Sequence, residues 1–336
     1  NHRVRLRRNP HYWDAANTGI EVIDLLPIGT PNTAFNLYET GAADIIWDKE
    51  LVPAELLDDL RQRPDYHGFT YLGTYFVRFN VTRKPFDDPR VRKALAMAID
   101  KRRIVEKITR ASETVASNLV PPGTANYTTP PAGLEFNPDA ARRLLAEAGY
   151  PDGKGFPQFQ YLFDAAAGGA AKTHAKIAVE IQQMFRQELG IRMDLRQMEK
   201  KVYLNAQTTL DYDLSRSSWI GDYNDPNTFL DLFMSNNGNN RTGWAKAEYD
   251  ELIRQANQEP DLKKRAQLLK KAETLLVQED PPIVPLYFYS GFNYFNPDQL
   301  SGIYPNILDL HPLNAIRKKV LDAKHKSPTP SAVGMP

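Results

Sequence analysis

The stretch that most constrains the fold is residues 158–198, which read as a strand, a helix and a second strand in that order. Apolar and polar residues alternate in the two outer parts, as in half-buried strands, and apolar residues recur at helical spacing between them. The residues that carry the three patterns are Phe159, Tyr161 and Phe163, then Ile177, Ala178, Ile181, Met184 and Phe185, and last Ile191, Met193 and Leu195. A connection of this length is a crossover, so the pattern predicts a parallel strand pair and an α/β fold.

Further elements are predicted on both sides of this unit. Asp88 before Pro89 and Asn137 before Pro138 are start signals of two helices, and Gly149 lies where the second would end. Strands are expected at 4–8, 21–27, 44–47 and 283–289, and helices at 33–40, 89–105, 140–148, 247–257 and 262–278. Together these elements indicate an α/β protein of two lobes.

The patterns divide the chain into parts. Residues 1–75 and 291–320 are expected to belong to a first lobe, and residues 76–290 to form a second lobe. Residues 321–336 are polar, contain proline and lack periodicity, so we expect a disordered tail. Because the chain starts at Asn1 within an expected strand, we also expect it to be a segment of a longer protein.

The composition argues against several classes of function. Lys and Arg total 42 against 41 Asp and Glu, so the net charge of +1 provides no field that would gather nucleic acid or anionic lipid. The absence of cysteine removes disulfides, thiol nucleophiles and cysteine-held metals. The six histidines lack ligand spacing, and neither a nucleophile elbow nor a zinc-protease motif occurs. We therefore expect no metal, no cofactor, no catalytic residues and no nucleic-acid partner.

The segment 216–230, RSSWIGDYNDPNTFL, places the carboxylate of Asp222 between Trp219 and Tyr223. Its Gly, Asp, Asn and Pro residues are also ordinary turn formers, so residue types alone fit a surface turn and a ligand-binding loop equally well. The aromatic run around Tyr289 is, on the same grounds, more typical of sheet core than of a ligand wall.

Five blocks of the chain, in order, resemble the oligopeptide- and dipeptide-binding proteins, the family 5 extracellular solute-binding proteins of ABC importers. The blocks are RNPHYWD at 8–14, PFDDPRVRKALAMAIDKRRIV at 85–105, AARRLLAEAGYPDG at 140–153, WIGDYNDPNTFL at 219–230 and PPIVPLYFY at 281–289. The resemblance runs to about residue 319 and implies two α/β lobes with mixed sheets that close over a ligand about a hinge. The second lobe would be the ligand-binding one. The family carries a further amino-terminal portion, so this chain would be the carboxyl-terminal part.

The resemblance also implies six ligand-binding residues, namely Asp222, Trp219, Tyr223, Arg216, Tyr289 and His174. Asp222 would pair with the α-amino group of a peptide, because its loop matches the W-x-x-D-Y-N loop of oligopeptide binders. Arg216 and His174 would pair with the carboxylate of shorter and longer peptides respectively, and the three aromatic residues would contact the peptide. Lys200 and Gln207 stand where the oligopeptide pattern has a tryptophan and an arginine, so pocket shape and peptide length would differ.

The expected function is the solute-binding component of a peptide ABC import system. It would capture oligopeptides or dipeptides between its lobes and deliver them to an inner-membrane permease, without catalysis and as a monomer. It would act in the periplasm or elsewhere outside the cytoplasm, with a membrane anchor in the preceding segment as one arrangement. The alternatives are the same fold binding a sugar, a metal chelate or haem, and, more remotely, a peptide hydrolase that uses Asp222.

Overall fold

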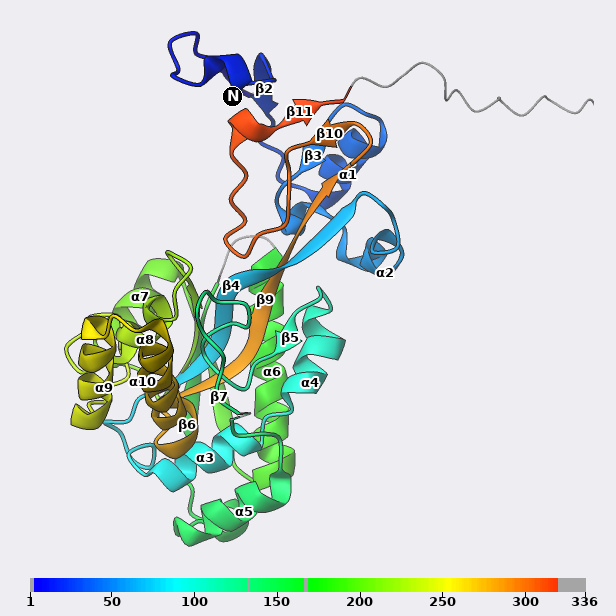
Figure 1. Cartoon of the computed structure of the whole chain (residues 1–336). Coiled ribbons are helices and arrows are strands. Elements are labelled where there is room, and N and C mark those ends of the chain that lie inside the picture. Colours follow the sequence, from blue (N-terminus) through cyan, green and yellow to red (C-terminus); the bar gives the residue numbers. More distant parts are fainter. Residues whose placement is uncertain (1–2, 132, 166–168, 320–336) are drawn as a thin grey trace, which may run out of the picture. The chain divides into compact units, whose positions relative to one another are not determined.

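The computed structural model describes residues 3–131, 133–165 and 169–319, so the expected disordered tail at 321–336 lies outside the described residues. The chain forms two compact units. The smaller comprises residues 1–68, 292–305 and 310–336, and the larger comprises residues 69–291 and 306–309. Two long strands, β4 (Tyr66–Phe79) and β9 (Ile283–Phe295), each begin in one unit and end in the other (Figure 1).

The larger unit is built on a mixed sheet whose strand order is β9, β4, β8, β6 and β7, with β5 paired to β9. Strand β4 pairs antiparallel with β8, while β6 pairs parallel with both β7 and β8. The strand, helix and parallel strand predicted at 158–198 are therefore confirmed as β6, α6 and β7. The bounds are β5 (Thr114–Val115), β6 (Phe159–Asp164), β7 (Met193–Met198), β8 (Leu214–Ile220) and α6 (Gly169–Leu189).

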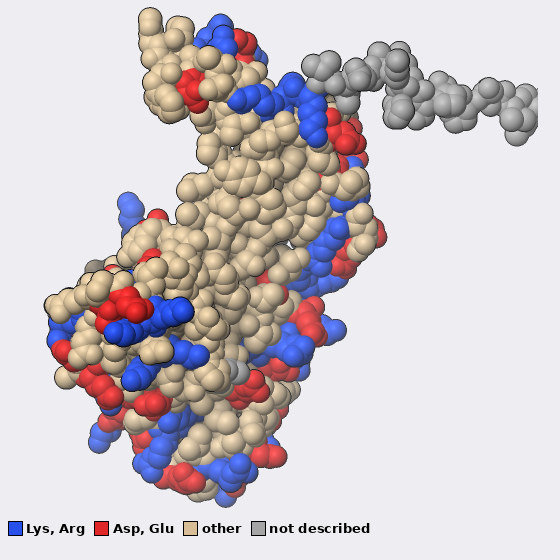
Figure 2. Space-filling model, viewed as in Figure 1, with Lys and Arg blue, Asp and Glu red and all other residues tan. Residues whose placement is uncertain are grey.

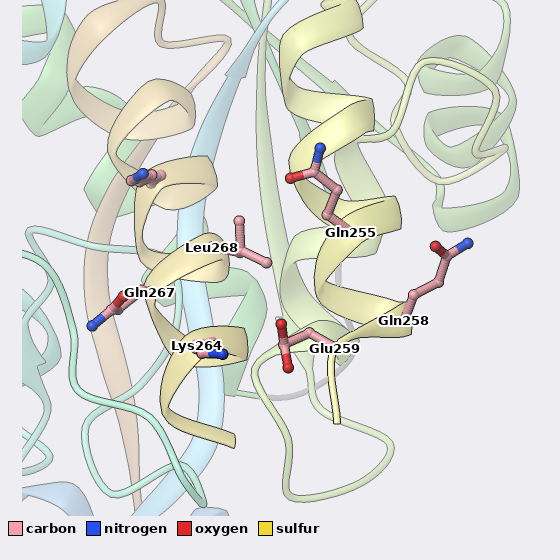
Figure 3. A pocket seen from close by; sticks show the side chains of 7 residues that line it. Gln255, Gln258, Glu259, Lys264, Gln267 and Leu268 are labelled. Carbon is pink, nitrogen blue, oxygen red and sulfur yellow. The ribbon is translucent and has the colours of Figure 1, made fainter. Parts of the chain in front are cut away.

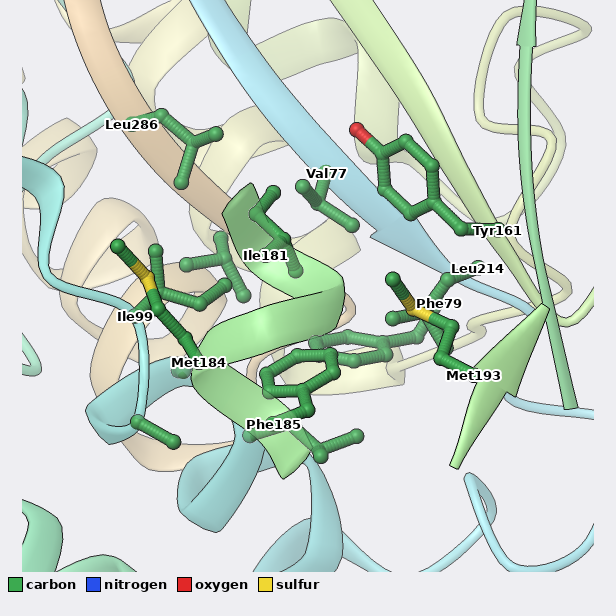
Figure 4. Close-up of a cluster of buried hydrophobic side chains, with 14 of the residues drawn as sticks. Val77, Phe79, Ile99, Tyr161, Ile181, Met184, Phe185, Met193, Leu214 and Leu286 are labelled. Atoms are coloured by element: carbon green, nitrogen blue, oxygen red, sulfur yellow. The ribbon is translucent and has the colours of Figure 1, made fainter. Parts of the chain in front are cut away.

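One face of this sheet is covered by α6 together with two shorter helices. Figure 4 shows Ile181, Met184 and Phe185 of α6 packed beside Val77 and Phe79 of β4, and all five side chains are buried. The predicted apolar face of α6 therefore makes the core contact that attaches the helix to the sheet. The two shorter helices are α3 (Pro89–Met97) and α5 (Pro138–Glu147).

A second buried cluster contains Leu72 and Phe76 of β4 together with side chains of three helices. Tyr203 of a further helix packs with Leu162 of β6 and Tyr212 in a smaller cluster. Because successive side chains of β4 and β6 alternate between these clusters and the α6 core, helices cover both faces of the sheet. The helices are α7 (Lys200–Thr208), α8 (Asn227–Leu230), α9 (Ala247–Gln258) and α10 (Leu262–Thr274).

The predicted helix starts are confirmed, and one predicted helix is interrupted. Asn137 accepts a hydrogen bond from the Ala140 N–H at 3.0 Å, and Gly149 adopts a positive φ of 99° after α5. The continuous helix expected over 89–105 is wrong: α3 ends at Met97, and α4 (Lys101–Arg103) begins after it. Asp100 causes the restart, because its side chain accepts from the Arg103 N–H at 3.0 Å and caps a new helix.

The smaller unit contains short strands and helices. Two strands near the start of the chain pair antiparallel, with Val4 opposite Leu25 and Leu6 opposite Ile23. A third predicted strand, at 44–47, is confirmed and pairs with the end of β9. The elements of this unit are β1 (Val4–Arg7), β2 (Val22–Leu25), α1 (Pro31–Glu39), β3 (Ile45–Ile46), α2 (Leu57–Leu60), β10 (Leu300–Ser301) and β11 (Arg317–Lys318).

The charged surface matches the near-neutral composition. On the face drawn in Figure 2, acidic and basic residues are interspersed, and neither sign gathers into one large patch. Among the described residues, none of the helices combines the length and apolar character needed to cross a lipid bilayer.

Candidate functional site

Three strands of the larger unit run in the same direction and end at one edge of the sheet. The last residue of β6 is Asp164, that of β7 is Met198 and that of β8 is Ile220. In open α/β sheets, ligands bind outside the carboxyl ends of the parallel strands. The carboxyl edge of β6, β7 and β8 is therefore the candidate ligand-binding edge of this sheet.

The side chain of Asp164 is only 1% exposed and lies among three basic side chains. Its Oδ2 accepts a hydrogen bond from Lys200 Nζ at 3.0 Å. Its Oδ1 lies 3.4 Å from Arg216 Nη1 and 3.4 Å from His174 Nδ1. Lys200 is half exposed, whereas Arg216 and His174 are buried, so this group of four residues, called here the Asp164 cluster, reaches from the interior to solvent.

The hydrogen-bonding capacity of the Asp164 cluster is incompletely used. Among the described residues, none makes a hydrogen bond to Asp164 Oδ1, His174 Nδ1 or Arg216 Nε, although all three atoms are buried. Most buried polar atoms in proteins have a hydrogen-bond partner. Three unsatisfied atoms at one place therefore mark a position where a bound group could complete the hydrogen bonds.

Burial and charge together fix the ionisation of the cluster. Burial raises the pKa of the Asp164 carboxyl, but His174, Arg216 and Lys200 outweigh burial and hold that pKa well below its usual range. Burial lowers the pKa of His174, and together with the charges of Arg216 and Lys200 it outweighs Asp164, which raises that pKa, so the imidazole is neutral near pH 7. Burial also opposes charge on Arg216, yet the surrounding tyrosines and Asp164 raise its pKa above the ordinary value.

Two cations, one carboxylate and a neutral imidazole leave the cluster with a surplus of one positive charge. Asp164 balances the buried guanidinium of Arg216, so the surplus charge is carried by the half-exposed Lys200 at the mouth of the cluster. One carboxylate from a ligand would balance the surplus and would also accept from the unused Nε–H of Arg216.

Neighbouring side chains hold Arg216 in place. The guanidinium carbon lies 5.0 Å from the centroid of the Tyr75 ring, and Tyr203 Oη donates to the Arg216 carbonyl. Gln207 Nε2 also donates to that carbonyl at 3.0 Å and is itself only 2% exposed. Gln207 therefore supports the backbone of β8 from the interior.

The loop after β8 carries Asp222, whose side chain is exposed. The Asp222 N–H donates to Thr228 Oγ1 at 3.1 Å, and Trp219 Nε1 approaches the same hydroxyl at 3.5 Å. Tyr223 is 47% exposed. A carboxylate and an aromatic ring are therefore presented to solvent together, while the backbone between them is anchored to α8.

Two further contacts fix the same loop from outside. Asp225 receives two hydrogen bonds from Arg265 of α10, at 2.7 and 2.8 Å, which is bidentate geometry. Asn224 Oδ1 accepts from the Ala125 N–H at 2.9 Å. These hydrogen bonds hold the backbone of the loop in place, so the side chains of Asp222 and Tyr223 project from an ordered loop.

The structure separates the six residues of the sequence hypothesis into two groups. Arg216 and His174 lie together in the Asp164 cluster, and Tyr289 contributes to the raised pKa of Arg216. Trp219 and Asp222 lie together at Thr228, followed by Tyr223. Both groups belong to the larger unit, and β8 connects them.

Strand geometry explains this separation. Arg216 is three residues before Trp219, and side chains alternate along a strand, so the two project from opposite faces of the sheet. Arg216 lies opposite Val77, which belongs to the α6 core, whereas Trp219 lies opposite Thr74 and packs with the helices of the other face.

Asp164 is the functional candidate that sequence reasoning missed. The sequence contained a feature that pointed to Asp164. It is the first carboxylate after the alternating residues Phe159, Tyr161 and Phe163, at the carboxyl end of a strand predicted to be parallel. What the sequence did not reveal is that His174, Lys200 and Arg216 converge on it from two helices and a second strand.

A separate hollow lies between α9 and α10. Figure 3 shows Gln255, Glu259 and Leu268 pointing into the space between the two helices. Its lining is mainly amide and charged side chains, and neither the Asp164 cluster nor Asp222 contributes to it. It offers no converging set of buried polar atoms, so the carboxyl edge of the sheet remains the candidate site.

Residues 1–241 match the model of the bacterial extracellular solute-binding proteins, family 5. The dipeptide-binding protein DppE of Bacillus subtilis is 35% identical over 95% of this chain, which covers 57% of DppE. The periplasmic murein peptide-binding protein MppA of Escherichia coli is 33% identical over 88% of this chain, which covers 55% of MppA. The chain thus spans little more than half the length of the curated relatives it matches.

Solved structures agree. The unliganded open form of the murein tripeptide-binding protein MppA has a TM-score of 0.79 and 32% identity, covering 95% of this chain and 61% of that one. OppA of Haemophilus influenzae in complex with the peptide RPPGFSPFR has a TM-score of 0.74 and 27% identity, covering 95% of this chain and 62% of that one. The resemblance seen in the five sequence blocks and the predicted α/β class are both confirmed. The chain belongs to the family 5 bacterial extracellular solute-binding proteins.

Proposed function

We propose that the protein is the solute-binding component of a peptide ABC import system and that it binds peptides without catalysis. The observation that carries the proposal is the Asp164 cluster, a buried site with one surplus positive charge and an unused N–H of Arg216. Asp222, an exposed carboxylate on a supported aromatic loop, provides the complementary charge. A peptide has one free carboxylate and one free ammonium, so its two ends match the two groups.

In this proposal the peptide carboxylate binds at Arg216, His174 and Lys200, and the peptide ammonium binds at Asp222. A charge-assisted hydrogen bond contributes about 1.5–3 kcal/mol once water is excluded. Both anchors bind the ends of the peptide, and neither recognises one of its side chains. Trp219, Tyr223 and Tyr289 would add aromatic contact area that tolerates different side chains.

The spacing of the anchors suits a short extended peptide. Arg216 and Asp222 are six residues apart, and an extended chain advances at most about 3.3–3.6 Å per residue, so their Cα atoms are at most about 21 Å apart. An extended peptide of a few residues spans such a distance, and a longer peptide would have to bend between the two anchors.

The cellular context follows from the relatives. DppE is a dipeptide-binding protein, and the OppA of Salmonella typhimurium is a periplasmic oligopeptide-binding protein that is 31% identical to this chain over 90% of its length. We infer that this protein acts in the periplasm or otherwise outside the cytoplasm. Its partners would be the peptide and a membrane-embedded permease, and it would bind its ligand as a monomer.

A non-peptide carboxylate is the second candidate, because the Asp164 cluster would accept any carboxylate of suitable shape. One relative, YgiS of Escherichia coli, is described as a probable deoxycholate-binding periplasmic protein and is 30% identical to this chain. The two candidates differ at Asp222. A peptide needs an ammonium partner there, and a carboxylate that lacks an amine does not.

Isothermal titration calorimetry with one tetrapeptide in three forms separates these candidates: unmodified, N-acetylated and C-amidated. The proposal predicts that each modification weakens binding at least tenfold and that Asp222→Asn abolishes discrimination against the acetylated form only. Asp298→Asn, which alters an exposed carboxylate outside the loop, is the matched control and should keep wild-type affinities. Equal affinity for the unmodified and acetylated peptides would refute amine recognition. Recovery of the peptide intact after prolonged incubation is expected, and turnover would refute the absence of catalysis.

A further inference from the structure

Arg78 of β4 is a buried arginine that lies outside the proposed peptide site. It lies opposite Ser215 in the β4–β8 pair and is only 3% exposed. Its guanidinium carbon lies 5.4 Å from the ring centroid of Phe76 and 5.9 Å from that of Phe233. It therefore projects toward the α8–α10 side of the sheet, away from the α6 core.

Arg78 has little polar compensation. Its Nη1 donates to the Asn240 carbonyl at 3.2 Å, while its Nε is buried and has no hydrogen-bond partner among the described residues. No carboxylate of the described chain lies within ion-pair distance of this guanidinium. Burial lowers its pKa to about 10, so the group is still charged at neutral pH.

Two other buried arginines of the same unit have the carboxylate partner that Arg78 lacks among the described residues. Arg92 is 2% exposed, and its guanidinium donates to the carbonyl of Pro281 at 2.8 Å, to that of Phe86 at 2.7 Å and to the Asp280 carboxylate. Arg216 has Asp164. A buried cation normally has a counter-ion, because the cost of desolvating it is several kcal/mol. Of these three buried arginines, Arg78 is the one without a counter-ion among the described residues.

A second arginine lies beside Arg78. Arg241 follows directly after Asn240, whose carbonyl Arg78 binds, and its own Nε is likewise buried and without a hydrogen-bond partner among the described residues. Its backbone adopts a positive φ of 47°, which is uncommon for a side chain of this size, and Tyr212 Oη donates to its carbonyl. Arg241 also lowers the pKa of Arg78, because the two positive charges repel each other.

We propose that Arg78 and Arg241 bind a small monovalent anion of the size and charge of chloride. One negative charge would balance the buried guanidinium of Arg78, while Arg241 is half-buried and is partly solvated on its own. We choose a single-atom anion because Arg78 is only 3% exposed, with the rings of Phe76 and Phe233 and the Asn240 carbonyl against its guanidinium. The inference is independent of peptide binding.

The test uses the purified chain in two measurements. In crystals soaked in bromide, an anomalous peak is expected within hydrogen-bond reach of Arg78 Nε. In solution, replacing gluconate by chloride at constant ionic strength should raise the wild-type midpoint of thermal unfolding by about 2 °C or more, since a ligand of the native state stabilises it. Arg78→Met and Arg241→Met should each lose this rise, and the matched control Arg254→Met, at an exposed arginine of α9, should keep it.

The crystal measurement needs no variant, so it decides the question even if Arg78→Met fails to fold. Ordered water without bromide at Arg78 would overturn the proposal. A chloride response that persists unchanged in Arg78→Met or Arg241→Met would also overturn it, because the stabilising anion would then bind elsewhere.

Discussion

The substitution Asp164→Asn isolates the counter-ion of the Asp164 cluster. Asparagine keeps the size of the side chain and removes its charge, so the buried guanidinium of Arg216 loses its only carboxylate partner among the described residues. Removing one partner of a buried ion pair costs about 3–5 kcal/mol. Lys200 is half exposed and can turn to solvent, so we expect a loss near the lower limit, about 3 kcal/mol of unfolding free energy in the ligand-free protein.

The same substitution should strengthen carboxylate binding. The surplus of the cluster rises from one positive charge to two, so a tetrapeptide should bind Asp164→Asn at least about fivefold more tightly, whereas its C-amidated form should not. Saturating peptide should correspondingly restore much of the lost stability. The stability of the wild type should also decline as pH falls below the ordinary carboxyl pKa of 3.8, because the lowered pKa of Asp164 favours folding only above it.

Urea unfolding followed by circular dichroism, with and without peptide, measures these effects. Asp194→Asn is the matched control: Asp194 is an exposed carboxylate on the neighbouring strand β7, so its loss should change stability by less than about 0.5 kcal/mol. If Asp164→Asn were as stable as this control, the carboxylate would not be balancing a buried charge. If it weakened binding of the free and the amidated peptide alike, Asp164 would support the site sterically and not as its counter-ion.

Three further predictions concern the larger unit. Burial raises the pKa of Glu273 to about 7, so ionisation of its carboxyl lowers the free energy of unfolding as pH rises from the ordinary pKa of 4.5 to 7. The substitution Glu273→Gln should remove this decline and give up to about 3 kcal/mol more stability at pH 8 in urea titrations. Arg265→Met breaks the bidentate pair with Asp225. In calorimetry this substitution should weaken binding of the free tetrapeptide and leave binding of its N-acetylated form nearly unchanged. Equal weakening of both forms would contradict a role of Arg265 in positioning the loop. Gly221→Ala places a methyl group 2.6 Å from the Leu72 side chain and should lower the unfolding free energy by about 1–3 kcal/mol, and an unchanged thermal midpoint would contradict the packing seen there.

Local patterns were sufficient to predict most elements of the fold. Alternation at Phe159, Tyr161 and Phe163 and the cap at Asn137 report on neighbouring residues, and both are confirmed. The interruption after Met97 was missed because the apolar spacing continues through it. The side chain of Asp100 accepts a hydrogen bond from the Arg103 N–H and so caps a new helix, and the apolar spacing contains no signal of this bond.

The candidate site was harder to predict, because its charges converge from distant parts of the chain. Asp164, Lys200 and Arg216 belong to β6, α7 and β8 and meet only because β6 pairs in parallel with its neighbours. The family resemblance implied that Arg216 and Trp219 both contact the ligand, whereas strand alternation places them on opposite faces. The ligand roles of these residues and of Asp222 stay a prediction.

A crystal structure of the protein with a bound tetrapeptide tests the central claim most directly. We expect the peptide carboxylate to lie beside His174 and within hydrogen-bond distance of Arg216 Nε, a buried N–H without an acceptor among the described residues, and the peptide ammonium to contact Asp222. A peptide whose carboxylate lies away from the Asp164 cluster, with Arg216 Nε still unpartnered, would contradict it.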